Sequence, residues 1–311
     1  SWLVGASPSS EWAGKSGQSF EAGVYYLDLG TGPFYIEYKN SAGQLVKKEI
    51  QLHFVDNLPE QTVKKYGWNG GLADLKDNQD YLLVINANIN GRKSDAKMAQ
   101  KISHQSVVQP DGSIINTVTI QRTHSGQAGE EFYGYPNTNY IRLYVPKGSQ
   151  LLKSGGFTWL DENFFKAPDK YAKTDPDLTN YIKEVGFDPL TGTGISEETN
   201  KTVFGNWLVT EPGKTNAAYF TYKLPFKIIQ QTKTEKKWFD LMNDNSTSGN
   251  YQLIVQKQSG IVSDFNSTII FPNDWSPTWN QGQQMKLASN GAVIEGIKLN
   301  TDMVWSLIMK K

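Results

Sequence analysis

The sequence contains no cysteine in its 311 residues. Disulfide bonds, thiolate nucleophiles and cysteine metal ligands are therefore excluded. Histidine is also scarce, because His53, His104 and His124 are the only three, and no H-x-H or H-E-x-x-H spacing joins them. The sequence favours structural or surface histidines over a transition-metal site.

Neither sign of charge is in excess, since 31 Lys and Arg residues balance 31 Asp and Glu residues. Nucleic-acid-binding proteins normally show a basic excess, so this balance argues against such a partner and against attraction to anionic membranes. No apolar run approaches the ~20 residues of a membrane helix. Because the sequence starts at Ser1 and not at methionine, we expect a cut N-terminus, with any membrane anchor in a missing N-terminal part.

Aromatic residues make up 12% of the chain, whereas methionine occurs five times. This mixture favours β structure over helical bundles. We predict a mainly β fold with few helices in loops. Residues 1–78 should form a small β-meander with a short helix, residues 79–225 an immunoglobulin-like β-sandwich with an insertion at 161–201, and residues 226–311 a second immunoglobulin-like β-sandwich.

Turn residues divide the chain into expected elements. Asn57, Pro59 and Glu60 predict the start of a helix of about two turns, which should end near Gly67. The turn at 109–113 predicts a hairpin of residues 100–108 and 114–123, and the turn at 211–214 predicts another of residues 202–209 and 217–224.

The insertion at 161–201 is rich in Asp, Lys, Pro and Thr. Asp175 and Pro176 predict the start of a helix that continues through Val185 and ends at Gly186. Loops of this length are functional or mobile, so we expect the insertion, on a sandwich edge, to be the first place to look for a partner surface.

The chain is organised around residues 80–95, which read D-Y-L-L-V-I-N-A-N-I-N-G-R-K-S-D. Residues 81–85 predict a buried strand, after which alternate asparagines are expected to leave the sheet in a polar turn. These asparagines could tie down neighbouring turns by hydrogen bonds, or they could line a polar ligand pocket. The ligand-binding candidates here are Asn86, Asn88, Lys93 and Asp95.

Two further sites come from the tryptophans and from the S-x-x-K pattern. Trp275 and Trp279 stand in a Pro-rich polar loop, where exposed indoles could stack on sugar rings or could anchor the core instead. Ser94 and Lys97 match the S-x-x-K pattern of serine acyl-enzymes. A second pattern of that group, K-S-G, matches Lys153, Ser154 and Gly155. The roughly 55 residues between the two patterns cannot hold the third motif and the helical domain of that group, which favours a chance match.

Oxygen ligands in two loops could hold calcium. No EF-hand order is present, so solvated turns explain these residues more simply, and we expect no cofactor, with calcium as the alternative. The residues are Asp240, Asn243, Asp244 and Asn245 in one loop and Asp175, Asp177 and Asp188 in the other.

Several segments lie in a recognisable order along the chain. They include the segment from Ile50 to Gly70, residues 80–95, T-H at Thr123 and His124, F-Y-G at 132–134, N-Y-I-R-L-Y-V-P-K-G-S at 139–149, V-F-G-N-W-L-V at 203–209, F-T-Y-K-L-P at 220–225 and Y-Q-L-I-V-Q-K-Q-S-G at 251–260. Together they resemble the C-terminal half of the bacterial family called domain of unknown function 4012, over roughly residues 45–275. The resemblance implies an extracytoplasmic envelope protein with a longer N-terminal half, and it implies no reaction and no catalytic residues.

We therefore expect a non-enzymatic structural or interaction module of the cell envelope or cell surface. It should bind proteins or envelope glycans through loops and strand edges, with self-assembly as one form of this binding. The lack of cysteine is compatible with an exported bacterial protein. The alternative is an accessory or enzymatic role in envelope polysaccharide handling.

Overall fold

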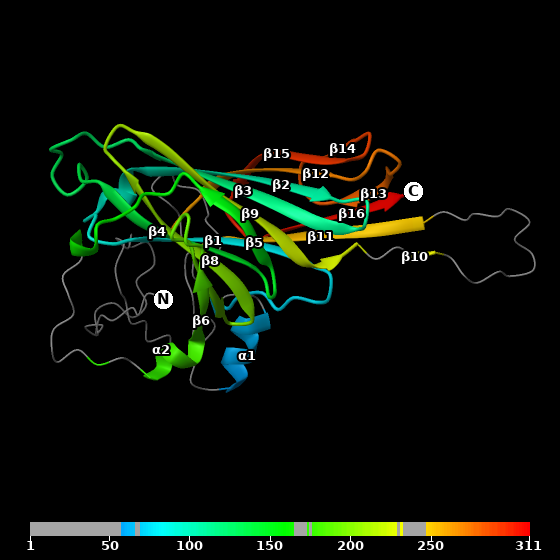
Figure 1. Ribbon diagram of the computed structural model, residues 1–311, viewed down its shortest axis with the longest axis horizontal. Coiled ribbons are helices and arrows are strands. Elements are labelled where there is room, and N and C mark those ends of the chain that lie inside the picture. Colours follow the sequence, from blue (N-terminus) through cyan, green and yellow to red (C-terminus); the bar gives the residue numbers. More distant parts are fainter. Residues whose placement is uncertain (1–56, 66–68, 165–172, 174–175, 229–230, 233–246) are drawn as a thin grey trace, which may run out of the picture. The chain divides into compact units, whose positions relative to one another are not determined.

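The computed structural model of the chain describes residues 57–65, 69–164, 173, 176–228, 231–232 and 247–311 (Figure 1). All of them belong to the unit Lys47–Lys311. The predicted meander within residues 1–56 lies outside the described residues. Helix α1 (Asn57–Lys65) occupies the range in which a short helix was predicted, so that prediction is confirmed. Within the described residues, no helix combines the length and the apolar character that a membrane span requires.

The described strands form two sheets, which confirms the prediction of a mainly β fold. The nine-stranded sheet has the order β13 (Ser276–Gln281), β16 (Met303–Lys310), β11 (Thr247–Gln256), β1 (Asp80–Asn88), β4 (Asn137–Pro146), β8 (Lys201–Thr210), β7 (Gly194–Glu198) and β6 (Ile182–Phe187), and β10 (Gln231–Thr232) pairs with β11. The seven-stranded sheet has the order β14 (Met285–Ala288), β15 (Gly291–Leu299), β12 (Ser263–Ile270), β2 (Met98–Val108), β3 (Ser113–His124), β9 (Thr215–Lys227) and β5 (Gln150–Gly155). The predicted hairpin at 100–123 is the β2–β3 pair.

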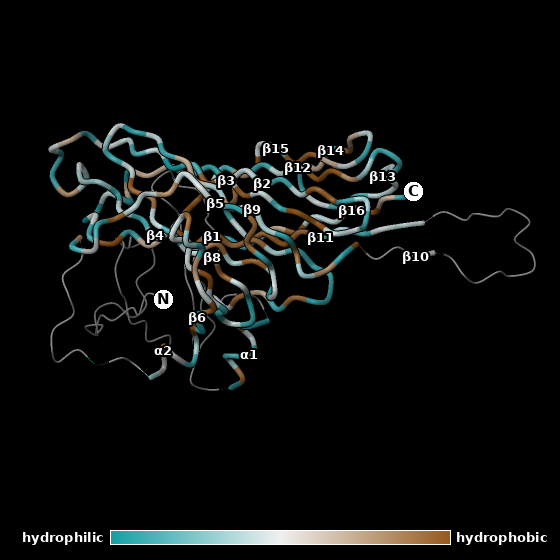
Figure 2. Tube along the Cα trace, viewed as in Figure 1, coloured by the Kyte–Doolittle hydropathy of each residue, from teal (hydrophilic) through white to brown (hydrophobic). Residues whose placement is uncertain are grey.

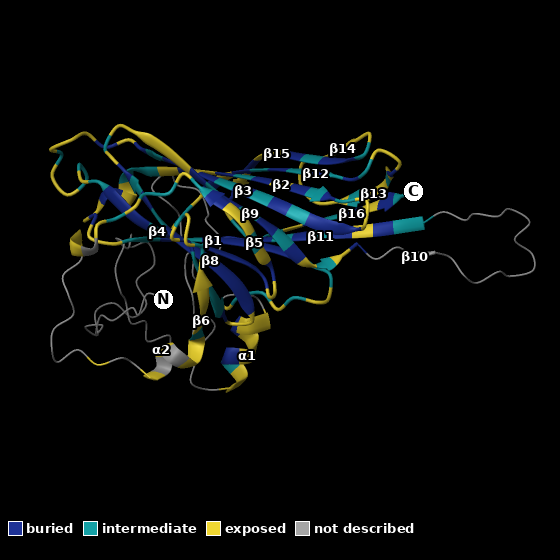
Figure 3. Ribbon diagram, in the orientation of Figure 1, coloured by how far each residue is buried: buried dark blue, intermediate teal, exposed yellow. Residues whose placement is uncertain are grey.

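One hydrophobic core lies between the two sheets. Leu82 of β1, Ile102 of β2, Phe265 of β12 and Trp305 of β16 all belong to it. Side chains alternate between the two faces of a strand, so each strand that faces the core on one side contributes every second residue. Strand β1 combines a hydrophobic tube in Figure 2 with a buried ribbon in Figure 3, whereas β6 is largely exposed.

The two predicted sandwich units share both sheets. Strand β1 pairs with β11 in parallel, from Asp80↔Leu253 to Leu83↔Gln256, and β2 pairs with β12 in parallel. If each unit stood alone, these strands would lie at the edge of a sheet with unpaired backbone N–H and C=O groups. This favours pairing between the two units. The expected division between residues 225 and 226 falls inside β9. We call the strands of the first predicted unit, β1 to β9, and those of the second, β10 to β16, the two strand groups, and one core continues across both.

Two local predictions are wrong. Strands β8 and β9 do not form a hairpin, because they belong to different sheets and the turn at 211–214 crosses between them. The alternation of apolar and polar residues predicts which face of a strand is buried, but it does not predict which sheet the strand joins. Helix α2 (Pro176–Tyr181) ends before Val185, and residues 182–187 form β6. A short isolated helix is only marginally stable. Residues 182–187 instead form backbone hydrogen bonds with β7 as a strand.

The outer face of β1 is also buried. Tyr81 and Leu83 pack there with Leu72 and Leu75 of the preceding segment. Lys201 Nζ donates to the carbonyl oxygen of Ala73 at 2.9 Å and holds this cover over the sheet. Burial on both faces explains the continuous apolar run at 81–85 and confirms the predicted buried strand.

Candidate functional site

Polar side chains continue the inner face of β1 beyond its apolar stretch. Asn86 and Asn88 do not leave the sheet, contrary to prediction, because they pair with Ile141 and Asn139 of β4 and remain part of the strand. Residues two apart point to the same side of a strand, so both asparagines share the face of Leu82. The end of the sandwich is therefore filled by amide groups.

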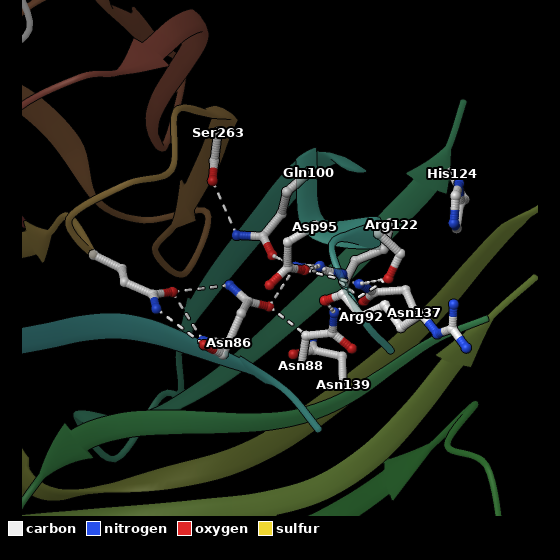
Figure 4. A network of polar contacts seen from close by, with 12 residues as sticks. Asn86, Asn88, Arg92, Asp95, Gln100, Arg122, His124, Asn137, Asn139 and Ser263 are labelled. Carbon is white, nitrogen blue, oxygen red and sulfur yellow. Dashed lines mark hydrogen bonds and ion pairs between the residues drawn. The ribbon is translucent and has the colours of Figure 1, made fainter. Parts of the chain in front are cut away.

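Arg122 of β3 occupies the centre of this polar end (Figure 4). Its Nη1 donates to Asn86 Oδ1 at 2.6 Å and to Gln100 Oε1 at 3.1 Å, and its Nη2 donates to Asp95 Oδ1 and Asn137 Oδ1, both at 3.1 Å. The side chain of Arg122 is fully buried. Burial lowers the pKa of Arg122 below its usual value, and the charge of Asp95 and its hydrogen bond oppose this effect.

Further hydrogen bonds connect the segment after β1 to β4. Asn137 Nδ2 donates to Asp95 Oδ1 at 2.8 Å and to Ser94 Oγ at 3.0 Å, and Asn88 Nδ2 donates to the same Ser94 Oγ at 3.1 Å. Asn139 Nδ2 donates to Asn86 Oδ1 at 2.8 Å. We call these residues, with Arg122 and Gln100, the arginine cluster.

Two surface loops cover the arginine cluster, namely residues 89–97 and residues 125–136. The amide of Lys93 donates to the carbonyl oxygen of Phe132 at 3.1 Å, and the amide of Ser125 donates to that of Lys97 at 2.9 Å. The Cζ atom of Arg92 lies 3.9 Å from the ring centroid of Tyr135. We call the exposed side of these two loops the paired-loop surface.

Each cation of the first loop lies over an aromatic ring of the second. Besides Arg92 over Tyr135, Lys93 Nζ lies 5.7 Å from the ring centroid of Phe132, and Lys97 Nζ lies 5.2 Å from that of Tyr133. Such contacts at exposed sites contribute roughly 0.5–1 kcal/mol each. The three contacts hold cations and rings together in one place.

The cations differ in their acidic partners. Lys97 Nζ is 2.7 Å from Glu130 Oε1. Arg92 and Lys93 are exposed and form no ion pair with any described residue. Phe132 is 47% exposed, so its ring is accessible beside Lys93.

His124 fixes the second loop from beneath. Its Nε2 donates to the carbonyl oxygen of Tyr135 at 3.0 Å, and its Nδ1 accepts from the amide of Gly126 at 3.0 Å. This pair of bonds requires the neutral imidazole with its proton on Nε2. The predicted structural role of His124 matches this position.

Three of the seven described non-glycine residues with positive φ angles lie in the two loops, and the other four are Asn78, Thr199, Asn200 and Gln284. Asn90, Arg92 and Phe132 have φ angles of 65°, 50° and 60°, in the left-handed region. Asparagine adopts this conformation readily, whereas Arg92 and Phe132 each cost about 1–2 kcal/mol, and strained residues cluster at functional sites. Within the described chain, the buried atoms Arg122 Nε, Asn88 Oδ1 and Asn139 Oδ1 have no hydrogen-bond partner, which costs stability as well. These features support the paired-loop surface as the candidate functional site.

The structure separates the other predicted site residues from this surface. Trp275 is 5% exposed and packs against Phe271 in the core, whereas Trp279 on β13 is 45% exposed. Ser94 is fully buried, and its hydroxyl bonds to Asn88 and Asn137. The S-x-x-K serine is therefore not accessible to a substrate.

The predicted calcium ligands lie partly outside the described residues. Those are Asp175, the side chain of Asp177 and residues 240–245. Asp188 instead closes a turn, since its Oδ2 accepts from Thr191 Oγ1 at 2.6 Å. In the described part, no three His, Asp or Glu side chains lie close enough together to hold a metal ion.

A second buried polar cluster lies deeper between the sheets. Asp80 Oδ2 accepts hydrogen bonds from Tyr251 and, at 2.7 Å, from Asn116 Nδ2, and it lies 3.9 Å from His104 Nε2. His104 Nδ1 is 2.8 Å from Ser267 Oγ. Burial raises the pKa of Asp80 to about 6 and lowers the pKa of His104 to about 3. This cluster is fully enclosed and offers no surface to a ligand.

The sequence interpretation missed half of the residues of the arginine cluster. The overlooked residues share a signal, since they occupy inward positions of strands that continue an apolar face. Arg122 follows Val118 and Ile120 at a spacing of two. The missed residues are Gln100, Arg122, Asn137 and Asn139.

Comparison with known proteins adds little. No family model matches the chain, and no curated protein matches it. Solved structures that match include a Legionella pneumophila protein described as nutrient-binding, with 10% identity, a TM-score of 0.35, and coverage of 74% of this chain and 70% of that one. Leukotriene A4 hydrolase from Saccharomyces cerevisiae has 8% identity, a TM-score of 0.33, and coverage of 69% and 29%. An M1 zinc metallopeptidase from Deinococcus radiodurans has 7% identity, a TM-score of 0.24, and coverage of 68% and 42%. These TM-scores are too low to carry an argument about function.

Proposed function

We propose that the chain is a non-enzymatic binding module of the bacterial cell envelope, and that the paired-loop surface is where it binds. The observation that carries this proposal is the position of Arg92 and Lys93. Both cations lie over rings of the neighbouring loop, and neither has an acidic partner among the described residues.

The arginine cluster supports this proposal because it orders the surface before any partner arrives. A loop that is already fixed loses less conformational entropy on binding. Asp95 connects the buried arginine cluster to the paired-loop surface, since its side chain is half exposed and bonded to the buried Arg122. Residues that carry binding commonly lie on loops positioned by a rigid scaffold.

The same proposal has two further parts. The chain is located outside the cytoplasm, and each of its two strand groups is related to an immunoglobulin-like sandwich. The resemblance to domain of unknown function 4012 supports the location. Two observations support the immunoglobulin-like relationship. Strands pair in antiparallel fashion within each strand group, and the chain passes between the two sheets at a corresponding point of each group. Strands β1 and β11 both lie in the nine-stranded sheet, and the strands that follow them in the chain, β2 and β12, both lie in the seven-stranded sheet.

Retention on isolated envelope fractions tests the proposed function. We would compare the wild-type chain with the variant R92A/K93A and with K101A/K286A, which removes two exposed cations elsewhere. The proposal expects retention of wild type and K101A/K286A and loss for R92A/K93A. Equal retention of all three proteins would contradict it. Turnover of envelope polysaccharide by the wild type would favour the alternative role in polysaccharide handling.

Self-association is a second candidate function, favoured by exposed apolar side chains in the insertion. Leu190 is 90% exposed and Phe187 is 68% exposed, and a groove of about 360 Å³ is lined by Leu152 and Leu190. Light scattering of L190S/F187S against the control L287S tests this. A concentration-dependent dimer that only L190S/F187S abolishes would support it, and a monomeric wild type would exclude it.

A further inference from the structure

We infer that the paired-loop surface binds an anionic glycan, meaning a sugar polymer that carries carboxylate or phosphate groups. This inference rests on the proposed function and names the ligand class of the same surface. The argument combines the charge, the rings, the shape and the order of the two loops.

The charge of the surface is positive after its internal pairs are removed. Asp95 is paired with the buried Arg122, and Lys97 is paired with Glu130. Arg92, Lys93 and Glu131 remain. Arginine presents a planar fork that matches carboxylate and phosphate oxygens, so an oxyanion is the complementary ligand group.

The aromatic rings select for a sugar that carries such an oxyanion. Phe132 is 47% and Tyr135 is 36% exposed, and each lies beside one of the two cations without an acidic partner. Aromatic rings offer a large flat apolar surface on which the apolar face of a sugar ring can pack. A ring and a cation side by side thus match the apolar face and the charged group of one acidic sugar.

An acidic peptide fits this surface less well. Extended peptides bind by adding a strand to a sheet edge, and helical peptides bind in an apolar groove. The edges of the two sheets are formed by other strands, β13, β6, β14 and β5. The balanced charge of the whole chain also argues against a nucleic acid.

The order of the loops gives the contacts a fixed spacing. The amide of Lys93 is bonded to Phe132, and the Tyr135 carbonyl is held by His124. The backbone segments that carry the cations and rings are therefore held in place without a ligand. A repeating polymer can meet such a fixed pattern with little loss of freedom on the protein side.

Titration with three polymers tests the inference, namely polygalacturonate, poly(glycerol phosphate) and neutral dextran. We expect the wild-type chain to bind at least one anionic polymer but not dextran, and the polymer that binds shows whether carboxylate or phosphate is the natural group. R92A/K93A should lose roughly tenfold or more in affinity, whereas K101A/K286A should stay close to wild type. E131Q should bind more tightly, because it removes the remaining negative charge.

The variant F132A separates glycan binding from simple ion pairing. It keeps both cations and should still lose affinity, and thermal melting shows whether it is folded. Unchanged affinity of folded F132A, or equal binding of dextran, would overturn the inference. Retention on envelope protein that is lost in R92A/K93A, without binding to either anionic polymer, would overturn the inference and leave the proposed function standing.

Discussion

Arg122 Nη2 and Asp95 Oδ1 lie 3.1 Å apart at the boundary between the core and the surface. The side chain of Arg122 is fully buried, whereas that of Asp95 is 50% exposed. A buried guanidinium needs a charged or polar partner, because its desolvation is costly. Asp95 therefore couples the stability of the core to the position of the loop that carries Arg92 and Lys93.

Replacing Asp95 should separate the hydrogen bonds of this pair from its charge. D95A removes the acceptor of Arg122 and of Asn137 and should lower the free energy of unfolding by about 2 kcal/mol. D95N keeps an acceptor oxygen at the same place and should lower it by about half as much. Urea denaturation measures both changes.

The pair of Asp264 and Lys298 is the matched control, because both side chains are exposed. D264A should change the free energy of unfolding by less than about 1 kcal/mol. If D95A is no more destabilising than D264A, Asp95 does not support the arginine cluster.

The buried pair of Asp80 and His104 should show opposed dependences of stability on pH. The pKa of Asp80 is raised from 3.8 to about 6, and the pKa of His104 is lowered from 6.5 to about 3, both by burial. Between about pH 4 and pH 6, folding takes up a proton at Asp80 and releases one at His104. The two contributions to the pH dependence of the free energy of unfolding therefore nearly cancel in the wild type. Tyr251 and Tyr222 also face Asp80, and their raised pKa values keep them neutral in this range.

Each single variant should reveal one of the two titrations. In H104Q only Asp80 remains, so the free energy of unfolding of this variant should be highest below about pH 4 and fall by about 3 kcal/mol as the pH rises through 6. In D80N only His104 remains, so stability should be full above about pH 6.5 and fall by up to about 5 kcal/mol as the pH drops toward 3. Denaturation at several pH values measures this, and curves parallel to wild type for both variants would contradict it.

A methyl group at Gly91 should disturb the loop through Asn88. A Cβ atom at Gly91 would lie 2.0 Å from Asn88 Oδ1. G91A must therefore displace the Asn88 side chain from Ser94, and it should lower the free energy of unfolding by about 1–3 kcal/mol. In the N88A background the same substitution should have a much smaller effect. Equal effects in both backgrounds would show that the contact does not matter.

The two tryptophans proposed to stack on sugars should behave differently. Trp275 is buried against Phe271, so W275A should lower the free energy of unfolding by about 3–5 kcal/mol. Trp279 is 45% exposed, so W279A should change it by less than about 1 kcal/mol. Thermal melting compares the two. A large loss of stability in W279A would show that the β13 edge depends on this indole.

Local sequence patterns predicted the strands and turns well because these depend on neighbouring residues. The turn at 109–113 identified the β2–β3 hairpin, and capping residues identified α1. Partner choice between strands depends on distant parts of the chain. The turn at 211–214 therefore looked like a hairpin, although it connects two sheets, and the two strand groups looked separate, although β1 and β2 pair with β11 and β12.

The candidate site was predicted only in its local part. Lys93 and Asp95 stand in a continuous polar segment and were visible as candidates. The β2–β3 hairpin that carries Arg122 was predicted from its turn, but no local pattern reveals that the far end of β3 lies beside Asp95. A charged residue in the inward register of Val118 and Ile120 was nevertheless a readable signal of a buried polar site.

Hydrogen exchange of the chain with and without bound envelope material tests the central claim most directly. The paired-loop surface should gain protection at residues 89–97 and 125–136, and this protection should be absent in R92A/K93A. Protection confined to another region, such as residues 182–190 of the insertion, with both loops unchanged, would contradict the account.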